Sequence, residues 1–165
     1  MARVRLVIGP VGAGKSTWCR ARAARDRAVH LNLDAWMARL YGADPRPAEG
    51  RLAWYLERRE RCFAQIWAVA TDLLDVGTDV ILEVGLLRRA ERAAFYAQVD
   101  AIDAELSVTV LDAPIEVRRA RVLQRNIDRG PTFSVEVPPE FFEIASAAWE
   151  PPDADERTAR EIRDG

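Results

Sequence analysis

The chain's only lysine lies in a segment whose spacing is suited to binding phosphate. Lys15 is the one exception among 24 basic residues that are otherwise arginine. The segment from Gly9 to Ser16 follows the pattern G-x-x-x-x-G-K-[S/T]. Backbone N–H groups of such a loop surround phosphate oxygens, and a compact ammonium reaches the β- and γ-phosphates better than a planar guanidinium does. The segment therefore predicts a nucleoside triphosphate site.

Each residue type in the segment has a separate expected role. Gly12 and Gly14 let the backbone approach the phosphates, Lys15 neutralises their charge, and the Ser16 hydroxyl is offered to Mg²⁺. We expect the triphosphate to be bound by Gly9, Pro10, Val11, Gly12, Ala13, Gly14, Lys15, Ser16 and Thr17, with Arg121 added from a later helix.

Two acidic residues come at the ends of expected strands. Asp34 follows the second strand and Glu83 closes the third, so both should lie at the carboxyl edge of a parallel sheet. Asp34 is the candidate general base for an attacking hydroxyl; its simpler role is N-cap of a helix from Ala35. Glu83 is the candidate partner of Mg²⁺, and its alternative role is to orient a substrate hydroxyl or an arginine.

A cationic helix face is the third candidate element. It precedes a glycine- and proline-containing loop at 129–137, which suggests a lid that closes on the triphosphate. Its alternative is a solvated helix whose charge is balanced by nearby acids. The face comprises Arg118, Arg121, Arg125 and Arg129, of which Arg125 and Arg129 are the expected catalytic contacts.

The elements needed to position these residues alternate along the chain. We expect strands at 3–8, 28–33, 79–84 and 106–111, and helices at 15–25, 35–41, 48–76, 88–102, 114–128 and 138–149. Alternation of this kind predicts an α/β fold in three layers, with helices on both faces of a parallel sheet of four to five strands. Residues 1–149 should form one domain with a lid at about 125–139. Residues 150–165 should be a polar tail, loosely ordered or adding one short element.

Composition narrows the class of protein. The chain is 49% apolar and 30% charged, with no run long enough to span a membrane and no signal peptide, which favours a cytoplasmic protein. The net charge of −2 gives no general attraction to nucleic acid. Cys19 and Cys62 match no metal-binding spacing and are expected to be free thiols.

The chain resembles the small P-loop kinase group that includes polynucleotide kinase, chloramphenicol phosphotransferase, gluconate kinase and zeta toxins, whose members are often labelled AAA-type ATP-binding proteins. The similarity to the polynucleotide kinase domain extends over most of the chain. It rests on the segments 9–20, 32–34, the strand ending at 83, 111–114 and 125–130.

This resemblance implies a P-loop NTPase fold, with Asp34 as general base and Arg129 as the lid arginine. Met37 stands where that kinase has an arginine for the acceptor phosphate, and Glu83 replaces an aspartate. The leading hypothesis is a kinase that uses ATP and Mg²⁺ to phosphorylate a hydroxyl of a small molecule, as a monomer or weak homodimer. The alternatives are a polynucleotide 5′-hydroxyl kinase and a nucleotide-binding switch or ATPase that acts through a partner.

Overall fold

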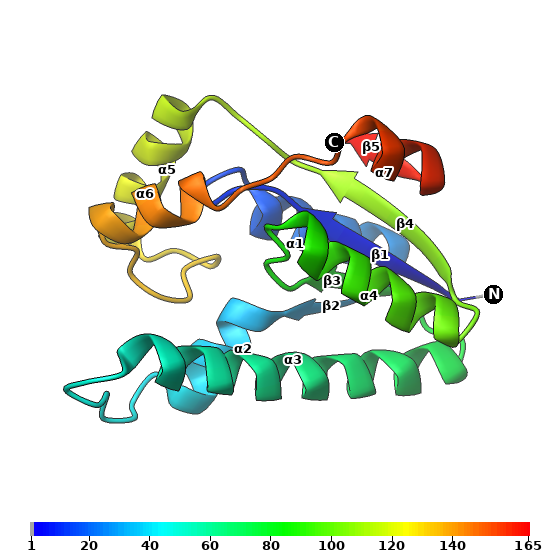
Figure 1. The fold of residues 1–165 in the computed structure, drawn as a ribbon, viewed down its shortest axis with the longest axis horizontal. Coiled ribbons are helices and arrows are strands. Elements are labelled where there is room, and N and C mark those ends of the chain that lie inside the picture. Colours follow the sequence, from blue (N-terminus) through cyan, green and yellow to red (C-terminus); the bar gives the residue numbers. More distant parts are fainter. Residues whose placement is uncertain (1) are drawn as a thin grey trace.

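The computed structural model describes residues 2–165, and in this part of the chain five parallel strands form one sheet (Figure 1). Their order across the sheet is β2-β3-β1-β4-β5. The strands are β1 (Arg3–Ile8), β2 (Val29–Asn32), β3 (Val80–Glu83), β4 (Glu105–Val110) and β5 (Ile162–Asp164). Five strands and an all-parallel arrangement confirm the predicted α/β fold.

Helices cover both faces of this sheet. They are α1 (Lys15–Asp26), α2 (Leu33–Tyr41), α3 (Arg51–Asp75), α4 (Arg89–Ala101), α5 (Ile115–Asp128), α6 (Pro139–Ala147) and α7 (Ala154–Ala159). The central strands are buried on both sides, so alternate residues of one strand enter different cores. In β1, Leu6 packs with α3 and α4, whereas Val7 packs with α1. Three layers follow from this alternation.

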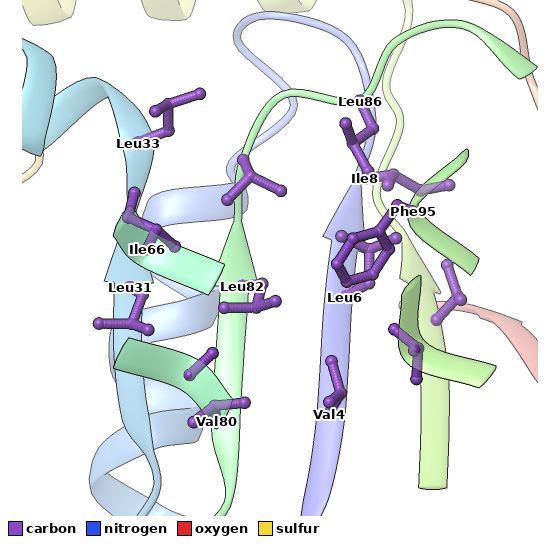
Figure 2. Packing of buried hydrophobic residues seen from close by; sticks show 14 of the residues in the cluster. Val4, Leu6, Ile8, Leu31, Leu33, Ile66, Val80, Leu82, Leu86 and Phe95 are labelled. Atoms are coloured by element: carbon purple, nitrogen blue, oxygen red, sulfur yellow. The ribbon is translucent and has the colours of Figure 1, made fainter. Parts of the chain in front are cut away.

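The larger core lies between the sheet and helices α3 and α4. Figure 2 shows Leu6 and Leu82 of the sheet beside Ile66 of α3 and Phe95 of α4. All four side chains are at most 1% exposed. Burial of this apolar surface supplies the main driving force that holds the strands in register. The candidate functional side chains at the strand ends are therefore held in position by a packed core.

Several helices begin or end a few residues away from their predicted bounds, for local reasons. The long helix starts at Arg51 because Gly50 has a left-handed backbone, with φ of 68°. The second strand ends early because the Asn32 side chain accepts a hydrogen bond from the Ala35 N–H and begins α2 at Leu33.

Residues 150–165 add more than the loosely ordered tail or single short element expected from the sequence. They form α7 and then β5, which extends the sheet by pairing with β4 in parallel. Glu156 of α7 is buried and accepts hydrogen bonds from the equally buried Arg92 of α4. This segment is therefore part of the folded domain.

Within the described residues, none of the helices combines the length and the apolar character that crossing a lipid bilayer requires.

Candidate active site

The loop between β1 and α1 has the backbone geometry of a phosphate cradle. Gly9, Gly12 and Gly14 all have positive φ, at 146°, 80° and 94°. A Cβ at Gly9 would lie 1.9 Å from the Leu111 carbonyl oxygen, so only glycine fits there. The helix that follows, α1, begins at Lys15. The free backbone N–H groups at the start of this helix point back at the loop. The arrangement is suited to an anion with several oxygens.

Lys15 folds back over this loop. Its Nζ donates hydrogen bonds to the carbonyl oxygens of Gly9 at 2.7 Å and Pro10 at 2.9 Å. Burial lowers the pKa of Lys15, and the negative charges of Glu83 and Asp34 oppose this effect. A phosphate oxygen would be a charged and therefore stronger acceptor than either carbonyl.

Glu83 is the centre of a hydrogen-bond cluster beside the phosphate-binding loop. Its Oε1 accepts a hydrogen bond from the Ser16 hydroxyl at 2.7 Å. Its Oε2 accepts one from Asn32 Nδ2 at 2.7 Å and lies 3.0 Å from His30 Nε2. The residue is 7% exposed, so these partners replace the water that an ionised carboxylate would otherwise require.

Two members of this cluster, His30 and Asn32, had no functional role in the sequence interpretation. They are two residues apart on β2 and so project from the same face of the sheet. Asn32 is also the direct register partner of Glu83 on β3. The sequence feature that could have identified these two residues is the occurrence of polar residues at alternate positions of an otherwise apolar strand.

The oxygen donors of Ser16 and Glu83 fit Mg²⁺, which prefers hydroxyl and carboxylate ligands. Cys19 and His30 also place a ligand atom within 4.8 Å of the Glu83 carboxylate, although the sequence spacing of the cysteines gave no sign of this. Burial, followed by the charge of Glu83, raises the pKa of the Cys19 thiol and keeps it protonated. A protonated thiol is a poor ligand, which leaves the oxygens as the fitting set.

Asp34 occupies the first turn of α2, two residues beyond Asn32. Its alternative role as N-cap is wrong, because Asn32 caps this helix. The Asp34 side chain is exposed to solvent. Partial desolvation by the surrounding protein, and then the charge of Glu83, raise the pKa of Asp34, while three cations act in the opposite direction: Lys15, Arg125 and Arg59.

Two of the predicted arginines lie over the loop. Arg125 of α5 acts electrostatically on both Lys15 and Asp34, and its Nε is buried without a hydrogen-bond partner in residues 2–165. Nη1 of Arg121 lies 4.0 Å from the position that a Cβ at Gly14 would take. Both guanidinium groups are therefore near the expected triphosphate position.

Arg129, the third predicted contact, has different neighbours in this structure. Its Nη2 lies 3.5 Å from the Glu136 carboxylate, and its guanidinium lies 5.4 Å from the ring centre of Phe133. Both neighbours belong to the segment between α5 and α6. Contact between Arg129 and a phosphoryl group stays a prediction.

The structure gives Arg118, the fourth arginine of the cationic face, a different role from the predicted lid contact. Arg118 is 6% exposed and donates hydrogen bonds to the carbonyl of Val11, the carbonyl of Ala113 and the hydroxyl of Ser146. It joins the phosphate-binding loop to the start of α5 and to α6. A Cβ at Gly12 would lie 2.6 Å from the Arg118 carbonyl oxygen, so loop and helix are in direct backbone contact.

Comparison with known proteins gives one match to a family of sequences. A family model described as an AAA domain, AAA_33, matches residues 4–152. Among curated proteins, none is similar enough in sequence to count as a match.

Solved structures resemble the chain over most of its length. A putative kinase from Chloroflexus aurantiacus has a TM-score of 0.71 at 18% identity, over 92% of this chain and 78% of the other. A structure of the Pnkp1/Rnl/Hen1 RNA repair complex has a TM-score of 0.65 at 22% identity, and the match spans 89% of this chain but only 43% of the other. Kti12 from Chaetomium thermophilum, in complex with ADP-AlF3, has a TM-score of 0.65 at 18% identity, over 98% and 88% of the two chains. These similarities establish the P-loop NTPase-like fold.

Proposed function

The chain belongs to the AAA_33 family of AAA domains, and on this basis we propose that it is a kinase that uses ATP and Mg²⁺ to phosphorylate a hydroxyl of a small molecule. One observation carries the proposal. Hydrogen bonds from Ser16 to Glu83 and from Asn32 to Glu83 join the phosphate-binding loop to the start of α2, where Asp34 lies in the first turn. A phosphate site and a candidate base thus share one edge of the sheet.

In this proposal Asp34 accepts the proton of the acceptor hydroxyl as the hydroxyl oxygen attacks the γ-phosphorus. The bond between the γ-phosphorus and the β,γ-bridging oxygen breaks, and ADP leaves with the electron pair. The raised pKa of Asp34 makes its carboxylate a stronger base than an ordinary aspartate. Transfer to water is disfavoured once the acceptor and the lid fill the site.

Cationic residues stabilise the charge that develops on the phosphoryl oxygens. Lys15 neutralises charge on the β- and γ-phosphates, and Arg121 and Arg125 approach from α5. The lid, residues 125–139, brings Arg129 to the transferred group when it closes. Arg118, whose Nη1 donates to the Val11 carbonyl, holds the phosphate-binding loop against α5.

Ser16 and Glu83 are the residues that would hold Mg²⁺. A magnesium ion held there would reduce the negative charge of the triphosphate. His30 and Asn32 keep the Glu83 carboxylate in place for this role.

A polynucleotide 5′-hydroxyl kinase is the second candidate, because one structurally similar protein comes from an RNA repair complex. Two features weigh against this candidate. Met37 stands where polynucleotide kinase has an arginine for the acceptor phosphate; it is 9% exposed, packs in the hydrophobic core and cannot pair with a phosphate. The net charge of −2 also favours a small acceptor.

The test is transfer from ATP labelled at the γ-phosphate. We expect label to appear on at least one member of a panel of sugars, sugar acids, nucleosides and 5′-hydroxyl oligonucleotides. Asp34→Asn should reduce this transfer by roughly 100-fold or more, as expected for loss of a general base. ATP hydrolysis without transfer, equal in the parent protein and Asp34→Asn, would instead support a switch or ATPase.

A further inference from the structure

The face of α3 that packs on the sheet changes in character near the active site. Cys62, Ile66 and Ala70 are the buried residues of this helix. From Cys62, steps of three and then four residues towards the N-terminus continue the same face to Arg59 and Tyr55. Figure 1 shows that this end of α3 reaches the side of the molecule where α2, α5 and α6 lie. The face thus becomes polar where it passes the strand ends.

Hydrogen bonds fix Arg59 at the carboxyl edge of the sheet. Its Nη2 donates to the carbonyl oxygens of Val84 at 3.3 Å and Gly85 at 3.1 Å, immediately after β3. Glu83 at the end of β3 is in register with Asn32, which caps the helix that carries Asp34. Arg59 therefore lies on the α3 side of the expected transfer site, across from the phosphate-binding loop.

The positive charge of Arg59 is only partly compensated by the protein, although it acts electrostatically on Asp34. Its hydrogen bonds within residues 2–165 use only Nη2, and both acceptors are neutral carbonyls. The paired carboxylate, Glu91, is 4.0 Å away and already accepts the backbone N–H groups of Leu87 and Arg88 through its other oxygen. The side chain is 22% exposed, so an anion could still approach it.

We propose that Arg59 binds an anionic group of the acceptor, a carboxylate or a phosphate, beside the hydroxyl that is phosphorylated. A planar guanidinium with free N–H groups is the side chain best suited to bind such groups in a fixed orientation. The acceptor is then a small hydroxy acid or a phosphorylated alcohol. This inference rests on the proposed kinase function and makes it more specific.

The test uses pairs of acceptors that differ only in charge. D-gluconate is compared with glucitol, and glucose 6-phosphate with glucose. We expect the anionic member of at least one pair to have a kcat/KM at least roughly tenfold higher, the scale of a charge-assisted hydrogen bond. The pair that shows the effect identifies carboxylate or phosphate as the anionic group. Arg59→Gln should remove most of this preference through a higher KM for the acceptor, and Arg59→Lys should retain part of it.

Arg61→Gln is the matched control, since Arg61 lies two residues further along α3, is 66% exposed and pairs with Glu57. It should leave the preference unchanged. The same compounds are also tested for thermal stabilisation of the parent protein in the presence of Mg·ADP, which needs no transfer. If neither pair shows a charge preference in this binding assay, the inference about Arg59 is wrong. If phosphate is transferred equally well to the neutral and the anionic member of each pair, the kinase function is supported and the inference about Arg59 is contradicted. If the anionic compounds bind preferentially but no phosphate is transferred, only the kinase function is contradicted.

Discussion

The Ser16 hydroxyl donates a 2.7 Å hydrogen bond to Oε1 of Glu83 and thereby joins the phosphate-binding loop to the end of β3. The two residues are 67 positions apart in the chain, and parallel pairing of β1 with β3 brings them together. The Ser16 hydroxyl and the Glu83 carboxylate are in direct contact beside the expected phosphate site, and both are oxygen ligands suited to Mg²⁺.

Glu83→Gln should weaken the response to Mg²⁺. The amide keeps most of the shape of the carboxylate but removes the charge that attracts the ion. The Mg²⁺ concentration for half-maximal activity should rise by roughly 10- to 100-fold, the usual effect of altering groups around a metal. A titration of activity against Mg²⁺ at constant ATP measures this change. Glu60→Gln, on the exposed face of α3, should behave as the parent protein does.

Lys15→Met should abolish the stabilisation of the protein by Mg·ATP. In the parent protein, ligand at 100 times its Kd stabilises the fold by about 2.7 kcal/mol. The free variant should be at least as stable as the parent, because the lowered pKa of Lys15 means that its buried charge costs stability. Tm with and without Mg·ATP gives both results. Arg25→Gln, at an arginine 76% exposed on the same helix, is the control; an undiminished shift in Lys15→Met would show that the loop has been misinterpreted.

Activity should depend on a pKa above that of an ordinary aspartate. Partial desolvation, followed by the charge of Glu83, raises the pKa of Asp34 above 3.8. Because the base must be ionised, kcat/KM should rise with pH through this raised pKa and level off above it. A pH profile of kcat/KM that is already flat at the ordinary pKa of aspartate would contradict this role.

Ionisation of Asp34, which should increase activity, should decrease the stability of the fold. The folded chain holds the Asp34 proton more tightly than the unfolded chain, so stability is lost as the pH rises from the ordinary pKa through the raised one. The Asp34→Asn variant has no carboxyl group to ionise at this position, so it avoids this loss of stability. It should have a higher Tm than the parent at neutral pH. The difference should shrink when the pH is lowered through the same window, as melting curves at several pH values will show. Lower Tm of Asp34→Asn at neutral pH would mean that the carboxylate supports the fold.

Local patterns were sufficient to predict four strands, the phosphate-binding loop and the acids at the strand ends. In each case a short run of residues determines the structure: apolar strands flanked by turns, or glycines before a lysine and a serine. Asp34 and Glu83 followed from one rule, that parallel strands place their carboxyl ends at the same edge. The contacts of Arg118 and Arg59 did not follow, because helical spacing gives the face on which a residue lies but not the groups that this face meets.

The fifth strand could not be predicted for a related reason. Ile162–Asp164 is a three-residue strand with one apolar residue, and so lacks the alternation that indicates a strand. Contacts distant in sequence hold it in place: β5 pairs with β4, and the preceding α7 is bound to α4 through Glu156 and Arg92. A buried charge pair of this kind leaves no local pattern in the sequence.

Glu156→Leu should destabilise the protein strongly, because it leaves the charge of Arg92 buried without a partner. Arg92 is fully buried and donates to both Glu156 oxygens, at 2.7 Å and 2.9 Å, and Tyr96 donates to one of them. Removing one member of such a pair costs about 3–5 kcal/mol, which urea denaturation will measure. The double variant Arg92→Met with Glu156→Leu should recover a large part of this loss, since it buries no lone charge. Glu161→Gln, at an exposed position near the same strand, is the control. A double variant no more stable than Glu156→Leu would show that packing of the C-terminal segment, and not compensation of charge, holds it on α4.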